Sequence, residues 1–142
     1  MRRVSLILAA LSISLAVGGC SLTGSSTANS GGYTGTAGDV ASTLNALSSD
    51  AASSDDTAIC SNVLSSRLVG VLDKLGVKGG CDTIISNQLK TLADTTLTIK
   101  SIKVSGKTAH ASVQTVDNGK KTISTVLLVD DSAGWRIDSL GS

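Results

Sequence analysis

The apolar residues of this chain change their spacing once, near Leu97, and this change constrains the fold more than any other feature. Before Leu97 they recur every three to four positions, as at Val40, Leu44 and Leu47, which is the period of an amphipathic helix. After Leu97 they alternate with polar residues, as in a strand. The order predicts an α+β fold, with two to three N-terminal helices packed on one face of a curved four-stranded antiparallel meander sheet.

Acidic residues and glycines mark where the expected helices begin and end. The first begins near Asp39, whose charge suits a helix N-terminus. The second begins near residues 54–56, which can cap it, and carries a broad apolar stripe as far as Leu72. The third opens at Asp82, after the glycine pair 79–80, and extends to Leu92.

Short turns separate the four expected strands. The first strand changes phase near residues 100–101, which predicts a β-bulge. The Asn118-Gly119 pair is a strong signal for a tight hairpin between the second and third strands. In the third strand, one face is expected to carry Ile123, Thr125, Leu127 and Val129. The expected strands cover residues 97–104, 109–114, 123–129 and 135–140.

The N-terminus has the pattern of a bacterial export signal. Two arginines precede an apolar run over residues 4–17, and about 14 residues are too few to cross a bilayer comfortably. The run ends in Val17-Gly18-Gly19-Cys20, which resembles a lipobox, the lipoprotein processing motif. This resemblance implies lipid transfer to Cys20 and cleavage after Gly19. The alternative is an ordinary signal peptide with an incidental cysteine.

The remaining chain divides into a tether and one domain. Small polar residues dominate the stretch after Cys20, so it is expected to be flexible. Tyr33 is expected to be an exposed aromatic of this tether, and the alternative is an anchoring or binding residue. The expected organisation is a signal peptide over 1–19, a lipidated Ser/Thr/Gly tether over 20–37 and a folded domain over 38–142.

Two cysteines remain once Cys20 carries lipid. An even number of cysteines in an oxidising compartment favours a disulfide between Cys60 and Cys81, near the starts of the second and third expected helices. The alternatives are a reactive thiol and a metal site. A metal site lacks partners, because His110 is the only histidine and the cysteines form no CxxC pairs.

The charge balance excludes nucleic acid as a partner. The chain has 12 basic and 11 acidic residues, and all the acids are Asp. Loss of Arg2 and Arg3 with the signal peptide leaves 10 basic residues against 11 acidic, a net charge of −1. Electrostatic binding to phosphates and stacking on bases both lack the residues they need, since the chain has one Trp, one Tyr and no Phe.

The C-terminal sequence from Leu127 to Ile137, LLVDDSAGWRI, resembles the ending of NTF2-like (cystatin-like α+β) domains. The resemblance extends over Gly38 to Leu140 and is closest to small secreted or lipid-anchored members. It implies a cone whose mouth holds a small apolar ligand, and sheets that pair face to face in homodimers. Some members are isomerases or dehydratases, whereas others only bind.

Residues suited to catalysis are few. His110 is out of phase with the expected inward residues of its strand, and most aspartates fall at helix caps and turns. Asp94 and Asp138 have no evident hydrogen-bond donor beside them in the sequence, whereas general acid–base catalysis needs a positioned titratable group with partners. No catalytic residue, cofactor or metal ligand is therefore predicted.

Two surfaces are candidates for binding. The first is the sheet face opposite the helices, where apolar side chains have no helix to cover them. The second is a pocket mouth at Trp135 and Arg136, where the indole could stack on a ligand and the guanidinium could pair with an anion. The alternative is that Trp135 fills the core and Arg136 faces solvent. The candidate sheet face comprises His110, Ser112, Ser124, Val126 and Leu128.

These observations predict a lipoprotein anchored in the cell membrane or outer membrane and facing the extracytoplasmic side. It is expected to act as a non-enzymatic binding or protein-interaction domain for an envelope protein, a small apolar ligand or a second copy of itself. The alternative is a carrier of a small apolar ligand, or an NTF2-like isomerase or dehydratase, that uses an internal pocket. An inward-facing, partly polar cavity favours the alternative, and a filled core favours the interaction domain.

Overall fold

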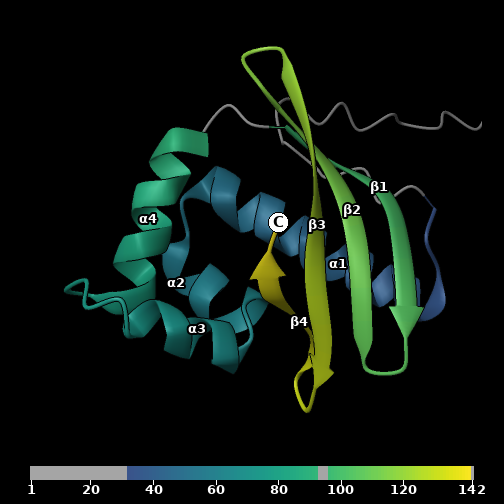
Figure 1. Ribbon diagram of the computed structural model, residues 1–142, viewed down its shortest axis with the longest axis horizontal. Helices are drawn as coiled ribbons and strands as arrows, with labels where there is room; N and C mark the ends of the chain where they lie inside the picture. Colours follow the sequence, from purple (N-terminus) through teal and green to yellow (C-terminus); the bar gives the residue numbers. More distant parts are fainter. Residues whose placement is uncertain (1–31, 93–95, 142) are drawn as a thin grey trace, which may run out of the picture.

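The computed structural model describes residues 32–92 and 96–141, with the side chains of residues 91 and 92 excepted. The predicted signal peptide, Cys20, most of the tether and Asp94 lie outside these residues. The described chain has the predicted α+β architecture, with helices first and a four-stranded antiparallel sheet after them (Figure 1).

Helix α1, Gly35–Ser53, is the longest helix of the described chain. It begins before Asp39, so the last residues of the expected tether are helical. Its buried side chains, which include Val40 and Leu44, recur at the predicted spacing. Tyr33, expected to be exposed, is half-buried against the core, because the segment leading into α1 packs on the domain.

The expected second helix is interrupted, and its prediction as one continuous helix was wrong. Helix α2, Asp56–Ala58, runs into a π-helical turn, η1, Ile59–Val63, and helix α3 covers Ser66–Asp73. Leu64 between them is extended and pairs in parallel with Ile137 of the sheet. The backbone N–H of Ser65 donates to the Ile137 carbonyl at 2.8 Å. These tertiary bonds replace the helical ones.

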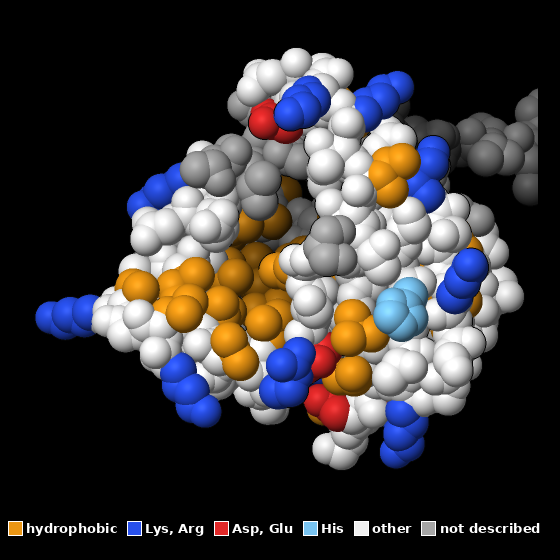
Figure 2. Space-filling view, viewed as in Figure 1, with side chains coloured by type: hydrophobic (Ala, Val, Ile, Leu, Met, Phe, Trp, Pro, Cys, Tyr) orange, Lys and Arg blue, Asp and Glu red, His pale blue; other side chains and the backbone are white. Residues whose placement is uncertain are grey.

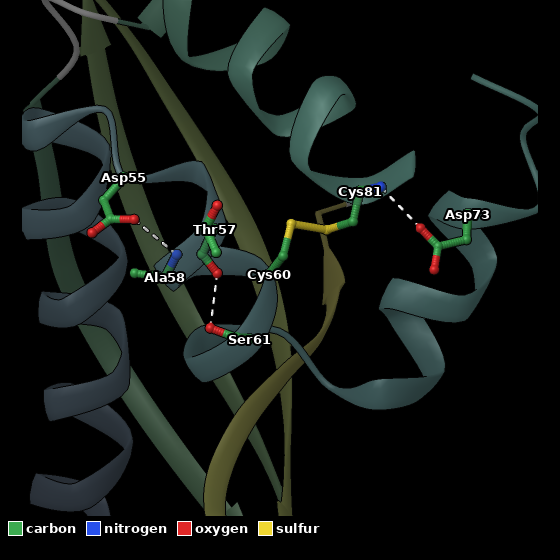
Figure 3. The surroundings of a disulfide bond; sticks show 7 residues. All are labelled: Asp55, Thr57, Ala58, Cys60, Ser61, Asp73 and Cys81. Carbon is green, nitrogen blue, oxygen red and sulfur yellow. Dashed lines mark hydrogen bonds between the residues drawn. A yellow bond between two sulfur atoms is a disulfide. The ribbon is translucent and has the colours of Figure 1, made fainter. Parts of the chain in front are cut away.

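Helix α4, Gly80–Leu92, begins at a capped N-terminus. The Asp73 carboxylate at the end of α3 accepts a hydrogen bond of 2.9 Å from the backbone N–H of Cys81 (Figure 3). A carboxylate suits this position because the first N–H groups of a helix have no helical acceptor.

The predicted disulfide is confirmed. Cys60 of η1 and Cys81 of α4 are joined, with their Cα atoms 6.2 Å apart (Figure 3). The bond connects two helical segments 21 residues apart, as expected from the positions of the cysteines. It also consumes both sulfur atoms that, with the nearby Asp82 carboxylate, would otherwise form a candidate metal-binding group.

The sheet is a meander in the order β1-β2-β3-β4. The register shifts between Ile99 and Ser101, where the bulge was predicted. Asn118 and Gly119 both have positive φ and form the predicted two-residue turn that pairs Asp117 with Lys120. The strands are β1, Thr96–Ser105, β2, Thr108–Asp117, β3, Lys120–Asp131, and β4, Gly134–Leu140.

The helices cover the sheet unevenly. Helix α1 crosses one face and contacts β1 and β4, whereas α2, α3 and α4 gather beyond the β4 edge (Figure 1). The expectation that the helices pack on one sheet face is therefore correct for α1, whereas α2, α3 and α4 lie beside the sheet. The core lies between α1, η1 and the inner sheet face, and its fully buried side chains include Leu44, Ile59, Leu128 and Ile137.

Replacing Cys60 by Ser is expected to lower the free energy of unfolding by about 2–5 kcal/mol, the usual cost of losing a disulfide in a small secreted domain. Urea denaturation followed by circular dichroism measures this difference. Dithiothreitol should destabilise the wild-type protein similarly and leave the variant unchanged. Equal stability of the two proteins without reductant would contradict the expectation.

Candidate functional site

A cavity of about 390 Å³ lies between the helices and the sheet. The space-filling view shows a hollow lined by hydrophobic side chains between the helical part and the strands (Figure 2). Its volume is within the range of about 300–1,000 Å³ usual for small-molecule pockets. The described domain therefore has an apolar hollow of ligand size beside its packed core.

The walls come from every layer of the fold. The C-terminal half of α1 and one face of α4 form the helical walls, and the inner sides of the strands form the opposite wall. The helical walls comprise Leu47, Ser48, Ala51 and Ala52 of α1 with Ile85, Gln88 and Leu89 of α4. The other lining residues are Ile59, Leu64, Leu97, Val113, Thr115, Ser124, Val126, Leu140 and Gly141.

Small side chains leave this space open. Ala51 and Ala52 of α1, Ser124 of β3 and Gly141, which follows β4, are all among the lining residues. Val113 and Ser124, which both line the cavity, are directly paired across β2 and β3. Neither Trp135 nor Tyr33 lines the cavity.

The chemistry of the lining is apolar and uncharged. Its polar side chains are Ser48, Gln88, Thr115 and Ser124, and none of the described lining residues is an acid, a base or a cysteine. Such a cavity favours a ligand dominated by hydrocarbon, with polar atoms near the few hydroxyl and amide groups. It provides no group for proton abstraction among these residues.

Trp135 and Arg136, the candidates for a pocket mouth, do not line this cavity. Trp135 is buried in the core near the start of β4, and its carbonyl accepts a hydrogen bond of 3.0 Å from the Thr43 hydroxyl of α1. Arg136 follows it in β4, pairs with Val129 and is partly exposed. For Trp135, the alternative that its side chain fills the core is therefore the one that the structure supports.

The candidate sheet face was wrong for three of its five residues. His110 is exposed and Ser112 is partly buried, but Val126 and Leu128 are 4% and 0% exposed, and Ser124 lines the cavity. The two-residue hairpin is the reason, because it pairs Ala111 with Val126 and Ala109 with Leu128. Directly paired residues share a face, so the alanines bring these residues to the inner side.

The expected inward set of β3 is correspondingly reversed. Ile123 is 65% exposed, Thr125 is exposed, and Leu127 and Val129 are only partly buried. Both alternating sets of this strand are rich in apolar residues, so the pattern by itself allowed either assignment. The Asn118-Gly119 turn together with the small inward residues of β2 was the signal that decided between them.

Asp138, which had no evident partner in the sequence, is a buried carboxylate in a dense hydrogen-bond cluster. It is the extra residue of a β-bulge, since Leu127 pairs with Ser139 and Leu128 with Ile137. The Ser65 hydroxyl donates to it at 2.5 Å, and the Arg67 guanidinium donates through Nε and Nη2 at 2.6–2.9 Å. Arg67 Nη2 also donates to the Asp138 backbone carbonyl at 2.7 Å.

This cluster stabilises the junction between α3 and β4. The Arg67 hydrogen bond lowers the pKa of Asp138, assisted by the Ser65 hydroxyl and opposed by burial. The side chains of Arg67 and Asp138 are 62% and 11% exposed, so water screens the cation much more than the anion. Asp138 is not a lining residue of the cavity, and its partners are those of a structural ion pair.

No protein-family model, curated protein or solved structure matches this chain. Within residues 32–92 and 96–141, no helix combines the length and hydropathy needed to span a membrane.

Replacing Asp138 by Asn is expected to lower the free energy of unfolding at pH 7 by about 1–2 kcal/mol, since charge-assisted bonds are lost but Arg67 is solvated. Because folding lowers this pKa, the stabilisation is complete above the unfolded value of about 3.9 and is lost as the pH falls through the folded value. Denaturation midpoints measured from pH 7 to pH 2 should therefore converge for the variant and the wild type.

The matched control for that series is Asp117→Asn, at the β2–β3 hairpin and away from α3. It should retain the wild-type acid profile. A constant gap between Asp138→Asn and the wild type down to pH 2 would contradict the proposed contribution of the ionised carboxylate.

Proposed function

We propose that this protein is a lipid-anchored carrier that holds a small apolar ligand in the cavity between its helices and its sheet. The observation that supports it best is the cavity itself, about 390 Å³ in volume and lined mainly by aliphatic side chains. A protein that works only through its outer surface has no need of such a space, since interiors are normally close-packed.

The carrier role is favoured over the enzymatic one by the lining. Isomerisation or dehydration requires a base near the reacting carbon and a donor for the developing oxyanion. The described lining residues supply hydroxyl and amide groups but no carboxylate or imidazole. The resemblance to NTF2-like domains is part of the proposal, since it implies a cone whose mouth holds a small apolar ligand.

The anchor is proposed from Val17-Gly18-Gly19-Cys20. Two or three acyl chains on Cys20 would keep the mature protein on the extracytoplasmic side of a membrane, since each buried methylene contributes about 0.8 kcal/mol. A membrane location also suits an apolar ligand, which is scarce in free solution.

Ligand binding is tested with the fluorescent apolar probe N-phenyl-1-naphthylamine. The wild-type protein should enhance and blue-shift the probe's emission. Replacing Ala51 by Phe places a ring in the cavity and should weaken probe binding by about tenfold or more, equivalent to about 1.4 kcal/mol. Fluorescence titration measures both dissociation constants.

Ser49→Phe is the matched control, because Ser49 is an exposed residue of the same helix and does not line the cavity. This variant should bind the probe as the wild type does. Melting temperatures of all three proteins establish that they are folded. Equal probe affinity in a folded Ala51→Phe variant, or no binding by the wild type, would rule out the carrier proposal.

Anchoring is tested separately by replacing Cys20 with Ala. This change should abolish incorporation of labelled palmitate into the protein expressed in a bacterial host and leave an unprocessed precursor. Cys60→Ser should retain the label if the protein accumulates. Labelling of the Cys20→Ala variant at the wild-type level would rule out the proposed lipid site.

A further inference from the structure

The end of α3 and the connection to α4 expose three large apolar side chains to solvent. Leu75 is 62% exposed, Val71 at the end of α3 is 45% exposed, and Val77 is 40% exposed. The connection forms the end of the domain at the left of Figure 1, where it projects beyond both helices. Of the six large hydrophobic side chains that the described chain exposes, these three lie within seven consecutive residues. Exposed apolar groups that gather in one place are typical of interaction and membrane surfaces, whereas single ones are ordinary.

Two lysines are interleaved with these side chains. Lys74 precedes Leu75 and Lys78 follows Val77, and both lysines are exposed. Two acids flank the lysines. The Asp73 carboxylate accepts the hydrogen bond from the Cys81 N–H at the start of α4, and the carboxylate of the exposed Asp82 lies within 4.8 Å of the disulfide sulfur atoms. The tip therefore combines aliphatic groups that can enter hydrocarbon with ammonium groups that can remain at headgroup level.

Hydrophobic side chains also connect this region with the cavity. In Figure 2 they spread over the helical side of the molecule and reach the hollow beside the sheet. The half-buried Leu68 and Leu72 of α3 pack against the core, and Leu64, which precedes α3, lines the cavity. A hydrocarbon chain leaving a bilayer at this end would thus meet apolar surface along its way.

We propose that residues 71–78 form a docking surface for an anionic phospholipid bilayer, into which Val71, Leu75 and Val77 insert while Lys74 and Lys78 pair with lipid phosphates. If the domain docks there, the ligand that enters the cavity is a hydrocarbon chain taken from the bilayer. This second part rests on the proposed carrier function, whereas the docking surface does not.

The chain outside the described residues is compatible with this contact. Cys20 and Gly32 are 12 residues apart, so a lipid on Cys20 would keep Gly32 within about 40 Å of the membrane in any conformation. The segment that leads into α1 and the α3–α4 connection lie at opposite ends of the domain (Figure 1). Simultaneous contact at both ends would lay the long axis of the domain along the bilayer.

Tryptophan fluorescence tests the docking surface in the lipidated full-length mature protein reconstituted on vesicles. Leu75→Trp introduces the reporter, and Ile123→Trp is its matched control, because Ile123 is 65% exposed but lies on the outer sheet face. The emission of Trp135, measured in the unsubstituted protein, is subtracted. Brominated phosphatidylglycerol should quench the tryptophan at position 75 and leave the one at position 123 unquenched.

The lysines provide the second arm of the experiment. Adding Lys74→Gln and Lys78→Gln to the Leu75→Trp protein should lower the docking equilibrium constant by about 30-fold. The Leu75→Trp protein with both lysines intact should also be quenched less on vesicles of brominated phosphatidylcholine, which is zwitterionic, than on vesicles of brominated phosphatidylglycerol, which is anionic. Quenching at position 75 no greater than at position 123, or equal for anionic and zwitterionic lipids, would overturn the proposal.

Probe binding separates this inference from the carrier function. The Lys74→Gln, Lys78→Gln protein should retain the wild-type affinity for N-phenyl-1-naphthylamine, since neither lysine lines the cavity. Loss of quenching with probe binding intact would overturn the docking surface alone. Quenching at position 75 without any probe binding would overturn the hydrocarbon ligand and leave the docking surface supported.

Discussion

The contact between residues Leu64 and Ser65 and strand β4 determines how the helices are placed relative to the sheet. Leu64 pairs with Ile137 at the edge of β4, and Ser65 donates its backbone N–H to the same residue. This pairing satisfies part of an edge that would otherwise present unpaired backbone groups. It also ends η1 and starts α3, because the Ser65 hydroxyl accepts a hydrogen bond from the Leu68 N–H.

Two further bonds hold the same region in place. The bulge at Asp138 turns a carboxylate toward α3, where Ser65 and Arg67 both donate to it. The disulfide joins η1 to α4 next to the cavity residues Ile59 and Ile85. The helical walls are thus fixed by covalent and polar bonds at their ends, so the hollow between them and the sheet stays open. We infer that this arrangement is what lets a domain with so few aromatic side chains maintain a cavity.

Parts of this architecture follow from local chemistry and were predictable. The order of helices before strands, the bulge near Ser101 and the Asn118-Gly119 turn each depend on residues close together in the sequence. The disulfide was predicted from the even number of cysteines that remain after Cys20, together with the expectation that the chain is exported. The prediction that Val126 and Leu128 lie on the outer sheet face was wrong. A strand with two apolar faces has no preferred inner side until its partner strand is placed. The cavity was foreseen only as an alternative, since its existence depends on distances between elements.

The sequence by itself therefore determined the period of each segment, the turn types and the pairing of Cys60 with Cys81. All of these depend on backbone sterics or on residue identity. Only the tertiary structure decided the break at Leu64, the ion pair between the buried Asp138 and the exposed Arg67, the inner face of β3 and the space beside Ala51. In each case the decisive free energy comes from groups brought together from distant parts of the chain. Neither periodicity nor propensity contains that information.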